Sequence, residues 1–313
     1  MVPTLLSVVE PRTGGDPMGR TKFVRRSLRT LAAELAARGF SICATSVAQL
    51  LRRQGYSPRI NVKRFTGPDP PDRDRQFLNI QDWIALFTES ALPILSVDGK
   101  KKELIGDFKN AGAAWRRDAE EVNVYDFPTD ALCRATPYGV YDLLAERGHV
   151  RVGTSSDTPA FAVEAIEDWW TRYGRGRYPG AEELLILADG GGSNGHRPRL
   201  WKAALQERIA DRHRLHVTVC HYPTGASKWN PVEHRLFGPI SINWARRPLR
   251  SLEVMLGWIR GAKVGGGGAV TACLDRDRYP TKVEVSNAQM KRLDIERHEF
   301  HPDWNYTISP RGS

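Results

Sequence analysis

The spacing of apolar residues divides the chain into a short helical part and a longer part that begins with strands. A helix is predicted to follow Ser27 and to end before Gly39, a residue typical of the position after a helix end. Its apolar residues recur at the interval of one helical face, and they are Leu28, Leu31, Ala32 and Leu35.

A second helix is predicted from Thr45 to Gln54, and Gly55 closes it. Two short helices joined by a Gly-containing turn are typical of a helix-turn-helix, although a plain helical hairpin has the same pattern. We therefore assign residues 21–64 to a small all-α helix-turn-helix domain. Residues 1–20 contain Pro and Gly and few periodic apolar positions, so we expect a loose leader there.

A Pro- and Asp-rich stretch, residues 66–75, is the clearest linker in the chain, and a helix is predicted after it from Gln76 to Ser90. The elements expected beyond it are three strands, then helix, strand, helix, strand and helix, over residues 93–97, 138–144, 149–153, 158–173, 184–188, 200–212, 215–220 and 228–237. The second and third strands should form a hairpin that turns near Gly148.

This order of strands and helices predicts an α/β fold, in which helices flank a mixed sheet. We assign residues 65–90 to a linker and helix, residues 91–260 to the sheet domain and residues 261–313 to a C-terminal extension.

The net charge of +10 is concentrated in one part of the chain. From Arg20 to Arg64 there are eleven Lys or Arg residues and one acid, Glu34, so the rest of the sequence is close to neutral. A compact basic module on a neutral body points to a polyanion such as DNA, although a basic face that only confers solubility has the same composition.

Composition excludes several other classes of protein. No apolar run approaches the roughly 18–20 residues that cross a bilayer, so we expect no membrane association and a cytoplasmic location. The four cysteines are widely scattered and include no CxxC pair, which argues against a zinc ribbon and against a disulfide framework.

Two acids follow directly on apolar strands, Asp98 after Ile-Leu-Ser-Val and Asp189 after Leu-Ile-Leu-Ala. In open α/β sheets ligands bind at strand ends, and neighbouring strands would place these carboxylates side by side. Bare carboxylates in one pocket repel each other, and a bound Mg²⁺ or Mn²⁺ removes that conflict. Glu233, on the helix after the last strand, can complete a site for two ions.

Glycines crowd the second acid in the stretch from Asp189 to Gly195, and they let a bulky ligand approach the backbone. A simple flexible turn has the same composition. The stretch lacks the GK[ST] of a nucleotide-binding P-loop. Ser193 and Asn194 within it could contact DNA or cap the helix that follows.

Five longer stretches carry a family resemblance, and they are Ser96–Asn110, Pro137–Asp142, Ala188–Gly195, Cys220–Pro223 with Ser227–Phe237, and Asp303–Ile308. Together they resemble the ISAzo13 family of insertion-sequence transposases, which belong to the DDE group with an RNase H-like catalytic fold. The likeness extends over nearly the whole chain from about Arg12. The Asn230-Pro-Val-Glu233 stretch is also similar to the NPxE signature of the wider mariner-like transposases.

The resemblance implies that Asp98, Asp189 and Glu233 are the three catalytic, metal-binding acids. It also implies Mg-dependent cleavage of insertion-sequence ends and strand transfer into target DNA. The partners it implies are double-stranded DNA, in the form of terminal repeats and target, and further copies of the chain in a homodimer or higher multimer on DNA.

The residues expected to contact DNA come from the basic helices and from the neighbourhood of the acids. They are Arg25, Arg26, Arg29, Thr45, Ser46, Gln49, Arg52, Arg53, Lys100, Lys101, Lys102, Lys228 and Trp229. Two alternatives to a transposase stay open at this point: an RNase H-like nuclease that cuts without strand transfer, and a decayed or domesticated DNA-binding protein without catalysis.

Overall fold

The structure is a computed structural model that describes residues 2–9, 13–15, 22–24, 27–57, 72–110, 120–223, 225–226 and 229–312. The chain divides into two compact units, Met1–Thr66 and Gly67–Ser313, and each is described by itself. No helix in these ranges is long and apolar enough to cross a bilayer.

The first unit is built from the helices α1 (Val2–Val9), α2 (Leu28–Ala36) and α3 (Ala44–Arg53), with a small antiparallel pair of strands, β1 (Thr13–Gly15) and β2 (Lys22–Val24). Apolar residues of the three helices form its core, and they are Leu5, Val8, Leu31, Leu35, Val47, Leu50 and Leu51. The expectation of a loose leader was wrong for α1, because Leu5 and Val8 stand one turn apart and are buried against the other helices.

The second unit contains a mixed sheet with the strand order β11-β12-β8-β7-β3-β5-β6-β10-β9. The central strands are β3 (Ile94–Gly99), β5 (Cys133–Asp142), β6 (Arg147–Gly153), β7 (Glu183–Asp189) and β8 (His216–Tyr222), and the short β4 (Glu103–Ile105) pairs with β5. β3 is parallel to β7, and β7 to β8, whereas β5 is antiparallel to β3 and β6. This arrangement confirms the predicted α/β fold with a mixed sheet.

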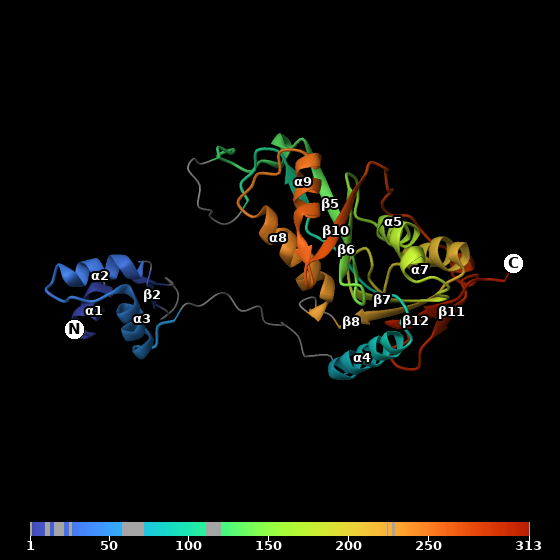
Figure 1. Ribbon diagram of the computed structural model, residues 1–313, viewed down its shortest axis with the longest axis horizontal. Coiled ribbons are helices and arrows are strands. Elements are labelled where there is room, and N and C mark those ends of the chain that lie inside the picture. Colours follow the sequence, from blue (N-terminus) through green and yellow to red (C-terminus); the bar gives the residue numbers. More distant parts are fainter. Residues whose placement is uncertain are drawn as a thin grey trace. The chain divides into compact units, whose positions relative to one another are not determined.

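Helices cover both faces of the sheet (Figure 1). One face is covered by α5 (Pro159–Trp169), which continues into the π-helix η3 (Trp170–Gly174) and α6 (Arg175–Arg177), and by α7 (Arg199–Leu205), which continues into the π-helix η4 (Gln206–Asp211). The other face is covered by α4 (Arg73–Glu89), the π-helix η6 (Val232–Phe237), α8 (Gly238–Trp244) and α9 (Leu252–Gly261). A 3₁₀ turn, η2 (Pro128–Asp130), precedes β5.

The last fifty residues are part of the sheet, so the boundary predicted at residue 261 was wrong. β10 (Gly268–Asp275) runs parallel to β6, and β9 (Lys263–Val264) pairs with it across the Gly-rich turn. After α10 (Asn287–Met290), β12 (Asn305–Ile308) pairs with β8 at the other side, and β11 (Ile295–Arg297) pairs with β12. β10 and β12 bond to partners more than eighty residues away, and local periodicity cannot reveal such pairing.

The predicted turn near Gly148 was also misplaced. The β5–β6 turn lies at residues 143–146, where Glu146 takes a φ of 50°, and Gly148 is paired within β6. Gly148 and Gly139 serve a different purpose, because both lie under η6. A Cβ at Gly139 would come within 2.6 Å of the Phe237 ring, and one at Gly148 would overlap Leu236. The missing side chains let η6 approach the sheet closely.

This close approach can be tested with Gly139→Ala. The added methyl would overlap the Phe237 ring, so we expect a loss of about 1–3 kcal/mol in the free energy of unfolding, as overpacked cores show. Urea unfolding of the full chain measures it. Gly176→Ala is the matched control, because a Cβ there meets nothing within 4 Å. Equal stability of the two variants would contradict the packing argument.

Candidate active site

Asp98 and Asp189 lie at the carboxyl ends of neighbouring parallel strands. β3 pairs with β7 in a register that sets Val97 beside Ala188, one residue before each acid. Side chains alternate between the two faces of a strand. Val97 and Ala188 belong to the core under α5 and α7. Both acids are therefore directed to the opposite face, which η6 covers.

A short chain of hydrogen bonds from β3 holds the helix of Glu233 over the same face. We call the two residues that form it, Ser96 and Asn230, the anchor. The Ser96 hydroxyl donates to Asn230 Oδ1 at 2.5 Å and accepts from the Val232 backbone N–H at 2.8 Å. Asn230 Nδ2 in turn donates to Asp189 Oδ1 at 3.0 Å. One buried serine and one buried asparagine thus link the strand of the first acid, the second acid and the helix of the third.

Electrostatics show that the three acids interact. Burial raises the pKa of Asp98 to about 8, and the negative charges of Asp189 and Glu233 add to the rise, although the Gly99 N–H at 2.7 Å opposes it. Burial also raises the pKa of Asp189, against the hydrogen bond from Asn230. Carboxylates that resist ionisation together form a donor set of hard oxygens, which suits a divalent cation such as Mg²⁺ or Mn²⁺.

His221 of β8 forms a hydrogen bond with the backbone at Asp189. This fully buried imidazole has its pKa lowered to about 3 by burial, so it is neutral and can donate from Nδ1 to the Asp189 carbonyl at 3.1 Å. Its other nitrogen faces the Tyr306 hydroxyl of β12 at 3.3 Å. The last strand of the chain thus supports the strand end that carries Asp189.

Two further residues lie beside the acids that sequence reasoning did not select. The Tyr138 hydroxyl is fully buried and has no hydrogen-bond partner among the described residues, and burial, then the charges of Asp98 and Asp157, raise its pKa. Asp157 Oδ2 would stand 3.3 Å from a Cβ at Gly99. Ser96 is a polar residue within the apolar strand before Asp98, and that pattern was a sign of its importance. Nothing in the local sequence points to Asp157, which lies about sixty residues after Asp98, just before a helix.

The residues expected to contact DNA differ in their exposure in the structure. Arg29, Thr45, Gln49, Arg52 and Arg53 are exposed on α2 and α3, and Ser46 is half-buried. Arg25, Arg26 and Lys228 lie outside the described residues.

Among the residues expected near the acids, Lys100 is half-buried and paired with Glu103 at 2.7 Å, whereas Lys101 and Lys102 are exposed. Trp229 packs on Phe77 of α4 with 5.5 Å between ring centroids, and Arg73 lies 5.2 Å over its ring. Ser193 and Asn194 do not cap α7, which begins after Pro198.

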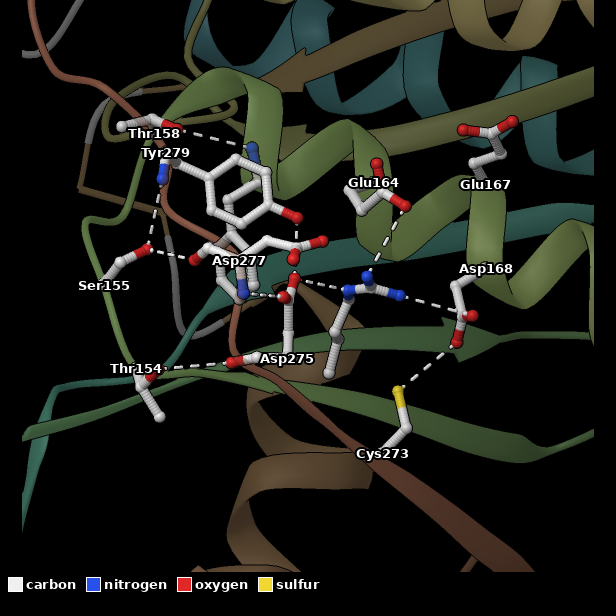
Figure 2. A network of polar contacts seen from close by, with 12 residues as sticks. Thr154, Ser155, Thr158, Glu164, Glu167, Asp168, Cys273, Asp275, Asp277 and Tyr279 are labelled. Atoms are coloured by element: carbon white, nitrogen blue, oxygen red, sulfur yellow. Dashed lines mark hydrogen bonds and ion pairs between the residues drawn. The ribbon is translucent and has the colours of Figure 1, made fainter.

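A second group with metal-ligand chemistry lies away from the acids. His149, Asp168 and Cys273 bring ligand atoms within 4.8 Å of one another. Among the described residues, Asp98, Asp189 and Glu233 do not come as close together as this. Asp168 is already neutralised by Arg151 at 3.3 Å and Arg172 at 2.6 Å. Its wider network is drawn in Figure 2. Two adjacent guanidinium groups disfavour a cation there, so we assign this cluster to the architecture of the fold.

Comparison with known proteins identifies the chain's relatives. The family model described as Rhodopirellula transposase DDE domain matches residues 4–310. No curated protein matches the sequence. Among solved structures, the chain is similar to the mariner Mos1 paired end complex with Mg, at 13% identity and a TM-score of 0.46, over 83% of this chain and 69% of that one. It is also similar to the Mos1 Strand Transfer Complex, at 12% identity and a TM-score of 0.45, over the same shares.

The repulsion among the acids predicts how stability depends on pH without divalent ions. The folded pKa of Asp98, about 8, exceeds its ordinary value of 3.8, so the folded state binds more protons between these values. Stability should therefore fall as pH rises from about 4 to about 8. Asp98→Asn should flatten this fall, as measured by thermal unfolding in chelator, whereas Asp126→Asn, at an exposed site, should leave it unchanged. Parallel pH profiles for all three proteins would refute the repulsion.

Proposed function

The chain belongs to the transposase DDE domain family described for Rhodopirellula, and from that premise we propose that Asp98, Asp189 and Glu233 are its catalytic acids. They would bind two divalent ions, Mg²⁺ or Mn²⁺, and direct cleavage at the ends of an insertion sequence and strand transfer into target DNA. The observation that carries the proposal is the anchor through Ser96 and Asn230, which links the strand that carries Asp98, the Asp189 side chain and the helix that carries Glu233.

The donor set supports the metal assignment. Carboxylate oxygens are the ligands that Mg²⁺ and Mn²⁺ prefer, and a cation would relieve the repulsion that raises the pKa of Asp98. When bound, a pair of such ions activates the attacking oxygen and stabilises the leaving oxygen of an in-line phosphoryl displacement.

The chain's own residues would orient the reaction. Ser96 and Asn230 keep Glu233 aimed at the edge where Asp98 and Asp189 lie, and buried His221 holds the Asp189 backbone. In the first step a water oxygen bonds to phosphorus and the 3′ oxygen leaves, taking a proton. In the second step that 3′-OH attacks a phosphorus of the target DNA and a target 3′ oxygen leaves.

DNA would be bound mainly through charge. The exposed arginines of α2 and α3 belong to the segment that carries the whole net charge, and we assign them to the terminal repeats. Lys101 and Lys102 follow Asp98 closely enough to contact phosphates beside the acids. Joining two element ends to one target calls for at least two active sites, so we propose that the chain acts as a homodimer or a higher multimer on DNA.

Substitution of the acids tests the catalytic assignment. Glu233→Gln and Asp98→Asn should each slow Mg²⁺-dependent nicking of terminal-repeat DNA by about 100-fold or more, because each removes an anionic metal ligand, while leaving DNA affinity nearly unchanged. Glu183→Gln is the matched control, since that acid is exposed at the opposite end of β7 from Asp189. Nicking by either variant at the wild-type rate would disprove the assignment.

Strand transfer distinguishes the transposase from a nuclease with the same acids. Pre-cut element ends that expose a 3′-OH should be joined to plasmid DNA in Mg²⁺, and the joined product is resolved on a gel. Nicking without any joined product would mean that the chain cuts DNA but does not transfer strands.

Binding to DNA is tested through its salt dependence. Each phosphate contact contributes about 0.9 to the slope of log affinity against log salt, so Arg52→Ala with Arg53→Ala should reduce that slope by about 2. Arg38→Ala, at the exposed end of the preceding helix, is a control outside the predicted contact set. An unchanged slope in the double variant would exclude α3 from phosphate contact.

A further inference from the structure

The glycine-rich loop after Asp189 is a compact turn whose two ends lie against each other. A Cβ at Gly195 would come within 3.0 Å of the Gly190 carbonyl oxygen, so only a residue without a side chain fits there. The Gly195 N–H also donates to the Gly192 carbonyl at 3.3 Å, and Gly192 takes a φ of 75°. The loop therefore closes on itself directly after one of the proposed metal ligands.

Two imidazoles hold consecutive carbonyl groups at the start of this loop. His221 Nδ1 donates to the Asp189 carbonyl at 3.1 Å, and His196 Nδ1 donates to the Gly190 carbonyl at 2.8 Å. A carbonyl oxygen only accepts hydrogen bonds, so both rings carry a proton on Nδ1. β7 ends at Asp189, where its pairing with β8 also ends. The two imidazoles thus take over from the sheet in holding the backbone on the far side of this acid.

Two neighbouring residues of α7 support these imidazoles. Trp201 Nε1 donates to the Tyr306 hydroxyl at 3.0 Å, and this hydroxyl in turn donates to His221 Nε2 at 3.3 Å. Lys202 Nζ donates to the carbonyl oxygen of His196. One turn of α7 therefore reaches both carbonyl groups at the start of the loop, through one imidazole each.

Lys202 is a buried cation whose contacts are a carbonyl and an aromatic ring. Its residue is 5% exposed, and Nζ lies 5.1 Å over the Tyr306 ring. Burial lowers the pKa of Lys202 from 10.5 to about 8, and the charge of Arg297 adds to the fall, although Asp303 opposes it. Burying an ammonium group in this way costs free energy. Such a cost is typical of groups that a functional site requires.

We propose that His196 and Lys202 are positioning residues for Asp189. They hold the loop closed, so that the Asp189 carboxylate keeps the place in which it binds Mg²⁺ or Mn²⁺. The proposal rests on the function proposed above, because it takes Asp189 as a metal ligand. Both residues act through the backbone after this acid. Loss of groups that orient metal ligands typically weakens metal affinity about 10–100-fold.

Binding of Mn²⁺ to the full chain without DNA, measured by isothermal titration calorimetry, tests the role of His196. His196→Leu removes the donor at similar size and should weaken Mn²⁺ binding about 10-fold. His196→Asn places an amide N–H close to the position of Nδ1 and should bind Mn²⁺ like the wild type. His216→Leu is the matched control, because His216 is exposed at the opposite end of β8. Equal weakening in the two variants at residue 196 would overturn the proposal, since packing and not the hydrogen bond would then matter.

The Mn²⁺ dependence of nicking tests the role of Lys202. Lys202→Met keeps the length of the side chain and removes its N–H groups. The Mn²⁺ concentration for half-maximal nicking of terminal-repeat DNA should rise severalfold. The rate at saturating Mn²⁺ should stay near that of the wild type, because bound metal then holds the carboxylate in place. Lys291→Met, at an exposed site, is the control. A lower saturated rate with an unchanged Mn²⁺ dependence would contradict the positioning role.

Asp189→Asn distinguishes this proposal from the proposed function in the same calorimetric measurement. If this variant binds Mn²⁺ poorly while His196→Leu and Lys202→Met bind it like the wild type, the positioning role is wrong and the proposed function stands. If Asp189→Asn and the wild type bind Mn²⁺ equally well, Asp189 is not a metal ligand, and both proposals fail.

Discussion

Repulsion among three carboxylates at the buried carboxyl ends of two central strands is the constraint around which the larger unit is organised. Burial and neighbouring negative charge raise the pKa of Asp98 to about 8, so the chain keeps these groups together at a cost in stability. Parallel pairing of β3 with β7 brings two of them to one edge, and the anchor through Ser96 and Asn230 brings the third. Strain of this kind concentrates where function requires it.

Close packing keeps the third acid in place. η6 presses Phe237 and Leu236 onto the strands at Gly139 and Gly148, where a side chain would leave no room. The C-terminal end of η6 continues into α8, and α8 and α9 share a core with β5, β6 and β10. The orientation of Glu233 therefore depends on hydrogen bonds at the start of its helix and on glycines in two strands, and a change in either would move the carboxylate.

The C-terminal segment completes the site from both edges of the sheet. β12 supports β8, where His221 braces the Asp189 backbone, and β10 carries Asp275, which binds Arg151 and Tyr279. The loop after β10 then forms one wall of a cavity between the starts of α5 and α7.

Local pattern determined much of this protein. Periodicity predicted the helices near Leu31 and Val47 and the succession of the central strands and helices along the chain, since an amphipathic face depends on residues close in sequence. Strand ends and family resemblance selected Asp98, Asp189 and Glu233, and their roles stay a prediction.

Only the tertiary structure decided the rest, because it depends on residues distant in sequence. It recruited residues 261–313 into the sheet, buried α1 against its neighbours, and moved the β5–β6 turn away from Gly148. It also brought Asp157 beside Gly99 and left Ser193 buried without a partner. Pairing between remote strands and the space left between packed elements are properties of the whole fold, so no local run of sequence encodes them.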